Sequence, residues 1–380
     1  MRTTIKPIHP FPARMAPELI WDELPDHSPR RLRVLDPMAG SGTTLVTAKL
    51  RGHQAIGYDR DPLAVLIARS WLANVKTDDV ERKAAKLLAK ARSRARDIKI
   101  ADAYPRSADD ETRAFVRYWF DTTNRIQLTV LSESISRLHD ASLRDLMWCA
   151  FSRLIITKNI GVSLAMDISH SRPHRSYEKA PVNAFDRFER AVYQVIKSSP
   201  FSKHDVHHPA GSMDLADARK LPIGNRSVDM VITSPPYLNA IDYLRGHKFS
   251  LIWKGHGLEE LRRVRTTNVG TECAAKAHKS DAATEYIMEM MCPANRLSKR
   301  NAGMLRGYVR DMRAVLSETK RVLRPGGKAV FVVGNCNLRE TFVQNSRCIE
   351  GLADELGMEL KTSAADHCRK IGVIYHRPDR

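Results

Sequence analysis

The chain has 380 residues, a hydrophobic content of 43% and a formal net charge of +19 at pH 7. This length exceeds one typical domain, so we expect one large domain with insertions or two domains. No apolar stretch approaches the ~20 residues of a membrane span, and residues 1–17 lack the apolar core of a secretory signal. We therefore expect a cytoplasmic protein without membrane segments.

The net charge and the cysteine spacing indicate which kinds of partner and site to expect. An excess of 62 Lys and Arg over 43 Asp and Glu favours a polyanionic partner, although solvated arginine faces would give the same composition. Charge alone does not separate DNA from RNA. The six cysteines are scattered without a C-x-x-C pair, so neither a zinc site nor a disulfide framework is favoured.

The first 75 residues predict the start of a parallel sheet. An apolar run at 32–36 is followed by a glycine-rich turn and a helical pattern at 43–50. A second strand at 54–59 ends on a carboxylate, and 62–72 returns to helical spacing. Such a strand–helix–strand–helix order is typical of α/β proteins.

The pattern then changes to helices. Residues 78–157 show helical spacing without strand alternation, notably at 81–98 and 111–154, which predicts a helical insertion. Residues 167–180 predict a loop rich in Ser, His, Arg and Pro, and 184–196 predict another helix.

The α/β pattern resumes near residue 211. We expect a polar mobile loop or small helical lid at about 255–300, and a helix at 304–323 that stops at Arg-Pro-Gly-Gly. The predicted strands and the last helix are 228–233 (strand), 328–334 (strand), 349–356 (helix) and 372–376 (strand).

A glycine-rich segment at 36–44, Asp-Pro-Met-Ala-Gly-Ser-Gly-Thr-Thr, joins the first strand to its helix. Glycines permit a close backbone approach, and the helix start offers free N–H groups. The phosphate-binding pattern G-x-x-x-x-G-K-[ST] is missing from the sequence. Asp36 at the end of the first strand therefore suits a ligand with a cationic group. A pyrophosphate group, which is anionic, is not expected here.

Asp59, at the end of the second strand, has the placement of an acceptor for ribose hydroxyls. A dinucleotide-binding dehydrogenase shares this feature. Its G-x-G-x-x-G pattern is incomplete here, because Leu45 stands where the third glycine would be. A plain surface-turn role for Asp59 is the weaker alternative.

The strand at 228–233 ends in Ser-Pro-Pro-Tyr, residues 234–237. Each proline fixes φ near about −65° and removes an N–H donor, and the residue before each proline is held extended. Rigid carbonyls and one aromatic ring thus project from the carboxyl edge of the sheet, where ligands bind in open α/β sheets. This turn suits a planar base whose amino group is drawn toward oxygen acceptors.

This tetrapeptide resembles the catalytic motif of S-adenosylmethionine-dependent DNA amino-methyltransferases. Residues 36–44 are similar to motif I of that family, 57–59 to motif II, and 6–15 to motif X, which closes over the methionine part of the cofactor. The resemblance covers about 6–72 and 211–334. It implies an α/β, Rossmann-like methyltransferase fold with a mostly parallel seven-stranded sheet and a helical insertion.

On this resemblance the chain divides into 1–75 (cofactor-binding half), 76–205 (helical insertion) and 206–380 (catalytic half). Asp36 would lie near the methionine amino group, and Asp217 matches an acid near adenine, with Asp214 as a competitor. The implied residues that bind S-adenosyl-L-methionine are His9, Pro12, Asp36, Pro37, Gly40, Ser41, Gly42, Thr43, Asp59 and Asp217.

An exocyclic amine is a poor nucleophile, and positive charge builds on its nitrogen as the methyl group transfers. Fixed acceptors stabilise that charge without reorganising, and in-line positioning supplies further rate. Ser234 and the Pro235 carbonyl would accept the amine's hydrogens, and Tyr237 would stack on a base flipped from the duplex. The implied catalytic residues are Ser234, Pro235, Pro236 and Tyr237. Serine in the first position favours cytosine-N4, with adenine-N6 as the alternative.

Double-stranded DNA is the implied partner, together with a restriction or defence nuclease, and no metal is implied. The loop at 169–176 combines guanidinium, imidazole and hydroxyl donors, and a purely solvated loop is its alternative. Assigning DNA recognition to the helical insertion is our own inference. The candidate DNA contacts are Arg172, His174, Arg175 and Arg245.

Two other functions are open at this point. RNA guanine-N2 or rRNA adenine methyltransferases usually have Asp or Asn before Pro-Pro, and Thr233-Ser234 argues against them. A catalytically silent nucleic-acid-binding module is disfavoured by the intact Ser234 and Tyr237.

Overall fold

The computed structural model describes the chain except residues 1–4, 13, 26–29, 170–172, 202–208, 239–241, 272–280, 339, 367–368 and 376–380. Its contacts form two compact units. We call Met15–Arg60, His208–Asp242 and Val264–Arg380 the sheet unit, and Met1–Arg14, Asp61–His207 and Tyr243–Arg263 the helical unit.

The sheet unit contains a seven-stranded sheet with the order β3-β2-β1-β4-β5-β9-β8. Neighbours from β3 to β5 run parallel, and β9 is antiparallel to both β5 and β8. The mostly parallel α/β sheet predicted from the sequence is confirmed. The strands are β1 (Arg33–Asp36), β2 (Gln54–Asp59), β3 (Gly211–Leu215), β4 (Val228–Thr233), β5 (Leu323–Val333), β8 (Glu359–Asp366) and β9 (Arg369–Tyr375), with a hairpin of β6 (Cys336–Leu338) and β7 (Thr341–Val343).

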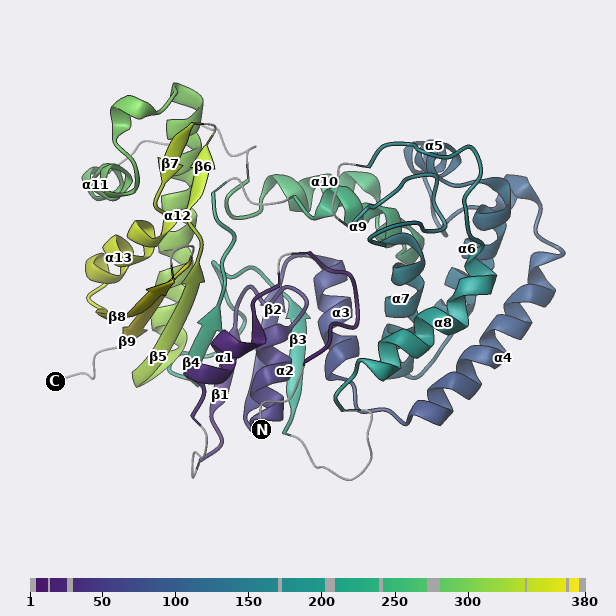
Figure 1. Ribbon diagram of the computed structural model, residues 1–380, viewed down its shortest axis with the longest axis horizontal. Coiled ribbons are helices and arrows are strands. Elements are labelled where there is room, and N and C mark those ends of the chain that lie inside the picture. Colours follow the sequence, from purple (N-terminus) through teal and green to yellow (C-terminus); the bar gives the residue numbers. More distant parts are fainter. Residues whose placement is uncertain are drawn as a thin grey trace. The chain divides into compact units, whose positions relative to one another are not determined.

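Helices cover both faces of this sheet (Figure 1). Leu35 of β1, Val231 of β4 and Phe331 of β5 belong to one buried core with side chains of α12 and α13. Gly57 of β2 faces the opposite side, toward α2. The helices of this unit are α1 (Pro17–Glu23), α2 (Thr43–Leu50), α11 (Ala282–Met291), η3 (Ala294–Arg296), α12 (Lys299–Val322) and α13 (Asn345–Glu355).

Gly57 explains how the first helix packs on the sheet without the third glycine of a dinucleotide fingerprint. A Cβ at position 57 would overlap Leu45 Cδ1 of α2 and lie 2.8 Å from Met213 Sδ of β3. Gly57 of β2 thus leaves the space that lets α2 pack closely on the sheet, and the Leu45 side chain fills this space.

The helical unit is built around α7, whose side chains from Leu146 to Phe151 are all buried. α3 and α8 both pack against α7, and α4 packs against α6 and α8. Aspartates cap several helix starts, including Asp121 and Asp140, whose carboxylates accept backbone N–H groups of the first turn. The helices are α3 (Pro62–Leu72), α4 (Thr77–Ala95), η1 (Ile100–Asp102), α5 (Asp110–Trp119), α6 (Thr122–Ser136), α7 (Ala141–Ile155), α8 (Ala184–Lys197), α9 (Leu244–Leu251) and η2 (Ile252–Lys254), together with α10 (Leu258–Thr266), whose last three residues belong to the sheet unit.

The helical unit is larger than the predicted insertion at 76–205. α3 contacts α7, so the unit begins at Asp61 instead of 76. It also includes the N-terminal arm and Tyr243–Arg263.

Several elements differ from the sequence-based expectations. The strand predicted at 328–334 is β5, which begins earlier, at Leu323, and includes the Arg-Pro-Gly-Gly segment. The pairing of β5 with β4 is irregular at this segment, between the pairs Val228–Leu323 and Met230–Lys328. The polar stretch at 255–300 contains helices α10 and α11, while 272–280 lies outside the described residues. The hairpin and β8 were not predicted, because their polar residues show no clear strand pattern. Among the described residues, no helix is long and apolar enough to cross a membrane.

We predict that Gly57→Ala lowers the free energy of unfolding by about 1–3 kcal/mol, because the new methyl group overpacks a buried helix–strand contact. Urea unfolding measures this change. Gly303→Ala in α12 is the matched control, since a Cβ there meets nothing within 4 Å. The control should be neutral or slightly stabilising, and equal loss in both variants would contradict the packing argument.

Candidate functional site

The candidate site lies in the sheet unit, at the carboxyl ends of three parallel strands. Asp36 ends β1, Asp59 ends β2 and Thr233 ends β4. β1 pairs with both β2 and β4, so these ends are neighbours along one edge. In open α/β sheets this edge is where ligands bind.

Asp36 is buried and held by hydrogen bonds. Its Oδ1 accepts from Thr233 Oγ1 at 2.7 Å and from the Met38 N–H at 3.1 Å. Burial raises the pKa of Asp36 to about 6, hydrogen bonds from Thr233 and Met38 oppose this shift, and the nearby Asp59 charge adds to it. The site therefore contains a carboxyl group that changes charge near neutral pH.

The glycine-rich loop is fixed by the end of β2. Asp59 Oδ2 accepts the Gly40 N–H at 2.8 Å, and the Tyr58 carbonyl accepts the Ala39 N–H at 2.9 Å. Gly40 and Gly42 have φ of 52° and 93°, in the left-handed region that favours glycine. Asp59 thus holds the glycine-rich loop in place through a contact within the protein.

The loop buries several further predicted residues. Pro37 is buried, and Thr43 is the buried first residue of α2. The Ser41 hydroxyl is buried and has no hydrogen-bond partner within the described residues.

The Ser-Pro-Pro-Tyr turn follows β4 directly. The Ser234 hydroxyl donates to the Val332 carbonyl of β5 at 2.9 Å. A hydroxyl has one donor and two acceptor lone pairs, so this bond leaves the Ser234 oxygen able to accept. Pro235 is buried, and Pro236 is half-buried.

Two glycines border Tyr237. A Cβ at Gly334 would lie 3.5 Å from Tyr237 Cε1, so the ring lies beside the end of β5. A Cβ at Gly270, where φ is 74°, would lie 3.1 Å from the Tyr237 carbonyl oxygen. The backbone and the ring of Tyr237 are thus each bounded by a glycine.

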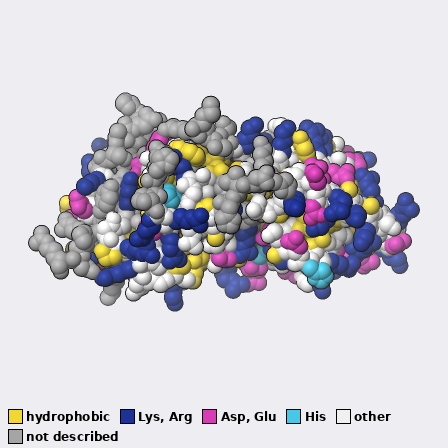
Figure 2. Space-filling model, turned by 90° about the horizontal axis from the view of Figure 1, so that it is seen from below, with side chains coloured by type: hydrophobic (Ala, Val, Ile, Leu, Met, Phe, Trp, Pro, Cys, Tyr) yellow, Lys and Arg dark blue, Asp and Glu magenta, His cyan; other side chains and the backbone are white. Residues whose placement is uncertain are grey.

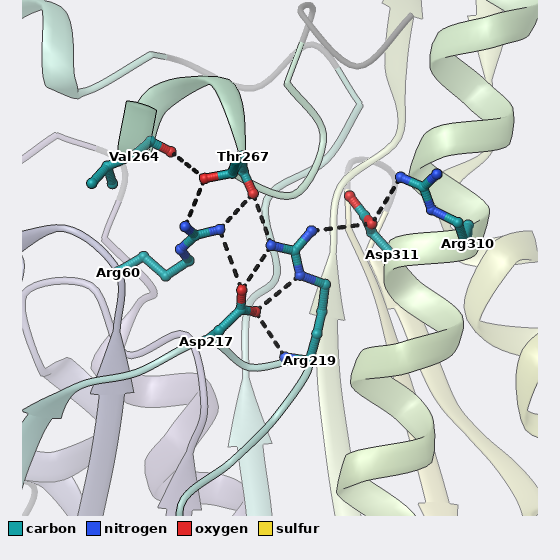
Figure 3. Close-up of polar contacts among 7 residues, drawn as sticks. All are labelled: Arg60, Asp217, Arg219, Val264, Thr267, Arg310 and Asp311. Carbon is teal, nitrogen blue, oxygen red and sulfur yellow. Dashed lines mark hydrogen bonds and ion pairs between the residues drawn. The ribbon is translucent and has the colours of Figure 1, made fainter. Parts of the chain in front are cut away.

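Asp217 lies just beyond β3 in a network of charged side chains (Figure 3). Its carboxylate accepts from Arg219 Nε at 2.9 Å and from Arg219 Nη2 at 2.7 Å. Arg60 Nη1 lies 3.3 Å from the same carboxylate. The structure therefore pairs this acid with two arginines.

His9 and Pro12 belong to the helical unit, where the N-terminal arm packs on α7. His9 is 2% exposed, and its Nε2 lies 3.0 Å from Ser152 Oγ, while Arg153 donates to the Ile8 carbonyl. Burial lowers the pKa of His9 well below its usual range, with added repulsion from Arg153 and His247. Pro12 is half-buried. Their contact with a cofactor stays a prediction.

The candidate DNA contacts also lie in the helical unit. Arg172 is outside the described residues, and His174 and Arg175 are exposed. The Arg175 guanidinium lies 5.5 Å from the centroid of the Tyr118 ring, and Arg245 is half-buried on α9. On the face seen in Figure 2, Lys and Arg side chains are spread among acidic ones.

Several residues at this edge were not found by sequence reasoning. Thr233 stands beside the catalytic motif, but only strand pairing shows that it reaches Asp36. Gly270 and Gly334 lack any motif, and Arg60 contacts Thr267, which is 207 positions away. In the helical unit, buried His247 bonds to Asp61 through Nδ1. A single sequence carries no signal for these long-range pairs.

Comparison with known proteins gives distant relatives. No protein-family model matches the chain. The type II methyltransferase M.BsoBI of Geobacillus stearothermophilus is 22% identical over 86% of this chain and 73% of its own length. M.MvaI of Kocuria varians is 21% identical over 86% of this chain and 76% of its own length. M.AvaI of a Nostoc strain is 24% identical over 87% of this chain and 73% of its own length. The chain is thus a low-identity relative of type II methyltransferases.

Solved structures are more distant. A protein from Pyrococcus horikoshii shares 10% identity with a TM-score of 0.32, covering 91% of this chain and 82% of its own. An S-adenosylmethionine-dependent methyltransferase from Methanosarcina mazei shares 9% with a TM-score of 0.33, covering 95% and 98%.

We predict that Thr233→Val raises the pKa of Asp36 above about 6, because the lost hydrogen bond stabilised the charged carboxylate. Titration of the carboxyl carbon by NMR measures this value. Thr47→Val is the matched control, because the buried Thr47 hydroxyl donates within its own helix to the Thr43 carbonyl. An unchanged or lowered Asp36 pKa in Thr233→Val would contradict the assignment.

Proposed function

We propose that this protein is an S-adenosylmethionine-dependent DNA methyltransferase that modifies an exocyclic amino group, with cytosine-N4 favoured over adenine-N6. Its type II methyltransferase relatives support the DNA methyltransferase assignment over most of the chain. The observation that carries the amino-group assignment is the Ser234 hydroxyl, which donates to Val332 and keeps its lone pairs as acceptors.

The cofactor fits the acids and glycines at the ends of β1 and β2. Asp36 offers a carboxylate for the amino group of the methionine part, and Asp59 offers acceptors for ribose hydroxyls beside its bond to Gly40. The positive φ angles of Gly40 and Gly42 give a loop that a ligand can approach closely. When bound, the cofactor supplies an activated methyl group on a sulfonium.

The turn at the end of β4 fits the base. Ser234 and the Pro235 carbonyl accept hydrogens of the amino group, which stabilises the positive charge that grows on nitrogen. The Tyr237 ring stacks on the base, and Gly334 at the end of β5 lies beside the ring. A base in a duplex must be flipped to reach such a turn.

Serine as the first residue of the turn supports cytosine-N4 as the target. A neutral hydroxyl is the acceptor here, whereas adenine-N6 enzymes of this superfamily more often have Asp or Asn in this position. Adenine-N6 is the second candidate, because Ser-Pro-Pro-Tyr occurs with both specificities.

The helical unit is our candidate for DNA contacts. Its exposed His174 and Arg175, together with the chain's net charge of +19, suit phosphate contacts. Arg172 and Arg245 belong to the same proposal. Because the relatives are type II methyltransferases, we also propose a restriction nuclease as a partner in the cell.

Labelled cofactor incubated with unmethylated genomic DNA, followed by nucleoside digestion and mass analysis, tests the function. We expect N4-methylcytosine. N6-methyladenine would overturn the cytosine preference and keep the enzyme class. Label only in RNA, or saturable cofactor binding without transfer, would contradict the DNA methyltransferase assignment.

Tyr237→Ala should lower methyl transfer by about a hundredfold or more, because the base loses the ring that holds it in line. Cofactor affinity should stay close to that of the unmodified protein, as measured by calorimetry. Tyr286→Ala is the control, since Tyr286 is an aromatic residue of the same unit, 68% exposed on α11. Loss of cofactor binding in Tyr237→Ala would place the cofactor, not the base, at this turn.

Cofactor affinity should rise with pH through about 6, the pKa of Asp36. Below that pH the carboxyl group is protonated and no longer pairs with the cofactor's ammonium group, while above it the carboxylate is ionised. Calorimetry from pH 5 to 8 measures the profile. Asp36→Asn should bind weakly and without this inflection, whereas Asp354→Asn, at an exposed acid of α13, should retain it. A profile that stays flat in the unmodified protein would remove Asp36 from the binding site.

A further inference from the structure

The carboxylate of Asp217 receives three hydrogen bonds from Arg219 and forms an ion pair with Arg60. Its Oδ1 accepts the Arg219 backbone N–H at 3.0 Å and Arg219 Nε at 2.9 Å. Its Oδ2 accepts Arg219 Nη2 at 2.7 Å and lies 3.3 Å from Arg60 Nη1. A carboxylate has about four acceptor positions, so an adenine amino group would compete with Arg219 and Arg60 for this carboxylate.

Both arginines also bind Thr267 (Figure 3). Arg60 donates to the Thr267 carbonyl and to Thr267 Oγ1, each at 2.6 Å, and Arg219 Nη2 donates to the same carbonyl at 2.9 Å. Arg219 is further fixed by Asp311 of α12, with Nη1 3.1 Å from the carboxylate. Two planar guanidinium groups thus hold one residue from two directions.

Thr267 belongs to residues 264–271, which we call the bracing segment. Within this segment Val269 is buried, and Gly270 lies against the Tyr237 carbonyl. A Cβ at Gly270 would also lie 3.7 Å from the ring of buried Tyr308 on α12. The segment is therefore packed at the catalytic turn as well as at the arginines.

The bracing segment runs along the carboxyl edge of the sheet. Arg60 follows β2, while Tyr237 follows β4, and β1 separates these two strands. Residues 267–270 form a turn after α10, with Thr267 bound by Arg60 and Gly270 beside the Tyr237 carbonyl. The segment thus links the cofactor half of the edge to its catalytic half.

We propose that Arg60 and Arg219 are positioning residues for Tyr237, acting through Thr267 and Gly270, and that Asp217 anchors these arginines instead of binding adenine. This inference rests on the proposed methyltransferase function. A stacking ring must be held in one place to keep the amino nitrogen in line with the methyl group. Arginine suits this role, because its planar fork binds two acceptors at once, which lysine does not reproduce.

Turnover of selected variants tests the positioning role. Thr267→Val and Arg219→Lys should lower kcat by about tenfold to a hundredfold with little change in the KM for the cofactor. Thr267→Ser keeps the hydroxyl that Arg60 contacts and should restore most of the turnover. Arg310→Lys is the matched control, because Arg310 contacts Asp311 at 3.4 Å and, among the residues drawn in Figure 3, contacts neither Thr267 nor Asp217.

A binding experiment tests Asp217 independently of turnover. Calorimetry compares S-adenosylhomocysteine with its inosine analogue, which carries an oxygen in place of the adenine amino group. In Asp217→Asn the preference for the adenine form should stay within about twofold of the unmodified protein, while kcat falls. A lost preference would show that Asp217 contacts adenine.

The outcomes separate the two proposals. If the unmodified protein methylates DNA but Thr267→Val and Arg219→Lys match its kcat, the positioning role is wrong and the function stands. If these variants raise the KM for the cofactor in proportion and Thr267→Ser brings no recovery, the network only shapes the cofactor site. If the unmodified protein neither binds S-adenosylhomocysteine nor transfers methyl groups, the function itself fails.

Discussion

The hydrogen bond from Thr233 to Asp36 joins the two halves of the candidate site. Asp36 begins the glycine-rich loop, and Thr233 immediately precedes Ser234, so one contact of 2.7 Å links the cofactor side to the catalytic turn. The bond depends on parallel pairing of β1 with β4, which brings residues 197 positions apart to neighbouring strand ends. It also stabilises the charged form of an acid whose pKa is raised by burial.

Local chemistry explains which parts of the fold could be predicted from the sequence. β2 and α3 occupy the predicted residues because Asp59 ends the strand and Asp61-Pro62 begins the helix, as an N-cap followed by proline at the first position. β8 was missed because its alternation is weak. The assignment of α3 to the helical unit was missed because it depends on which of its apolar faces meets α7.

The same distinction applies to the site. Asp36, the glycines and Ser-Pro-Pro-Tyr lie in short contiguous segments, and each segment ends a strand at the edge where ligands bind. Asp217 could be picked out only as an acid after a strand. Whether such an acid can accept from a ligand depends on its donors, and here they are Arg219 and Arg60. The folded structure shows which donors contact Asp217, and the residues next to it in the sequence do not.

An ion-pair network of this kind is weak evidence for stability, because half-exposed pairs contribute little. Its geometry is more informative than its energy. Arg60 and Arg219 share one carboxylate and one threonine, so movement of either arginine moves the other's partner. Since Gly270 has no side chain and meets the Tyr237 carbonyl, little room is left for the turn to shift independently. The segments that follow β2, β3 and β4 are therefore coupled through side-chain and loop contacts outside the sheet.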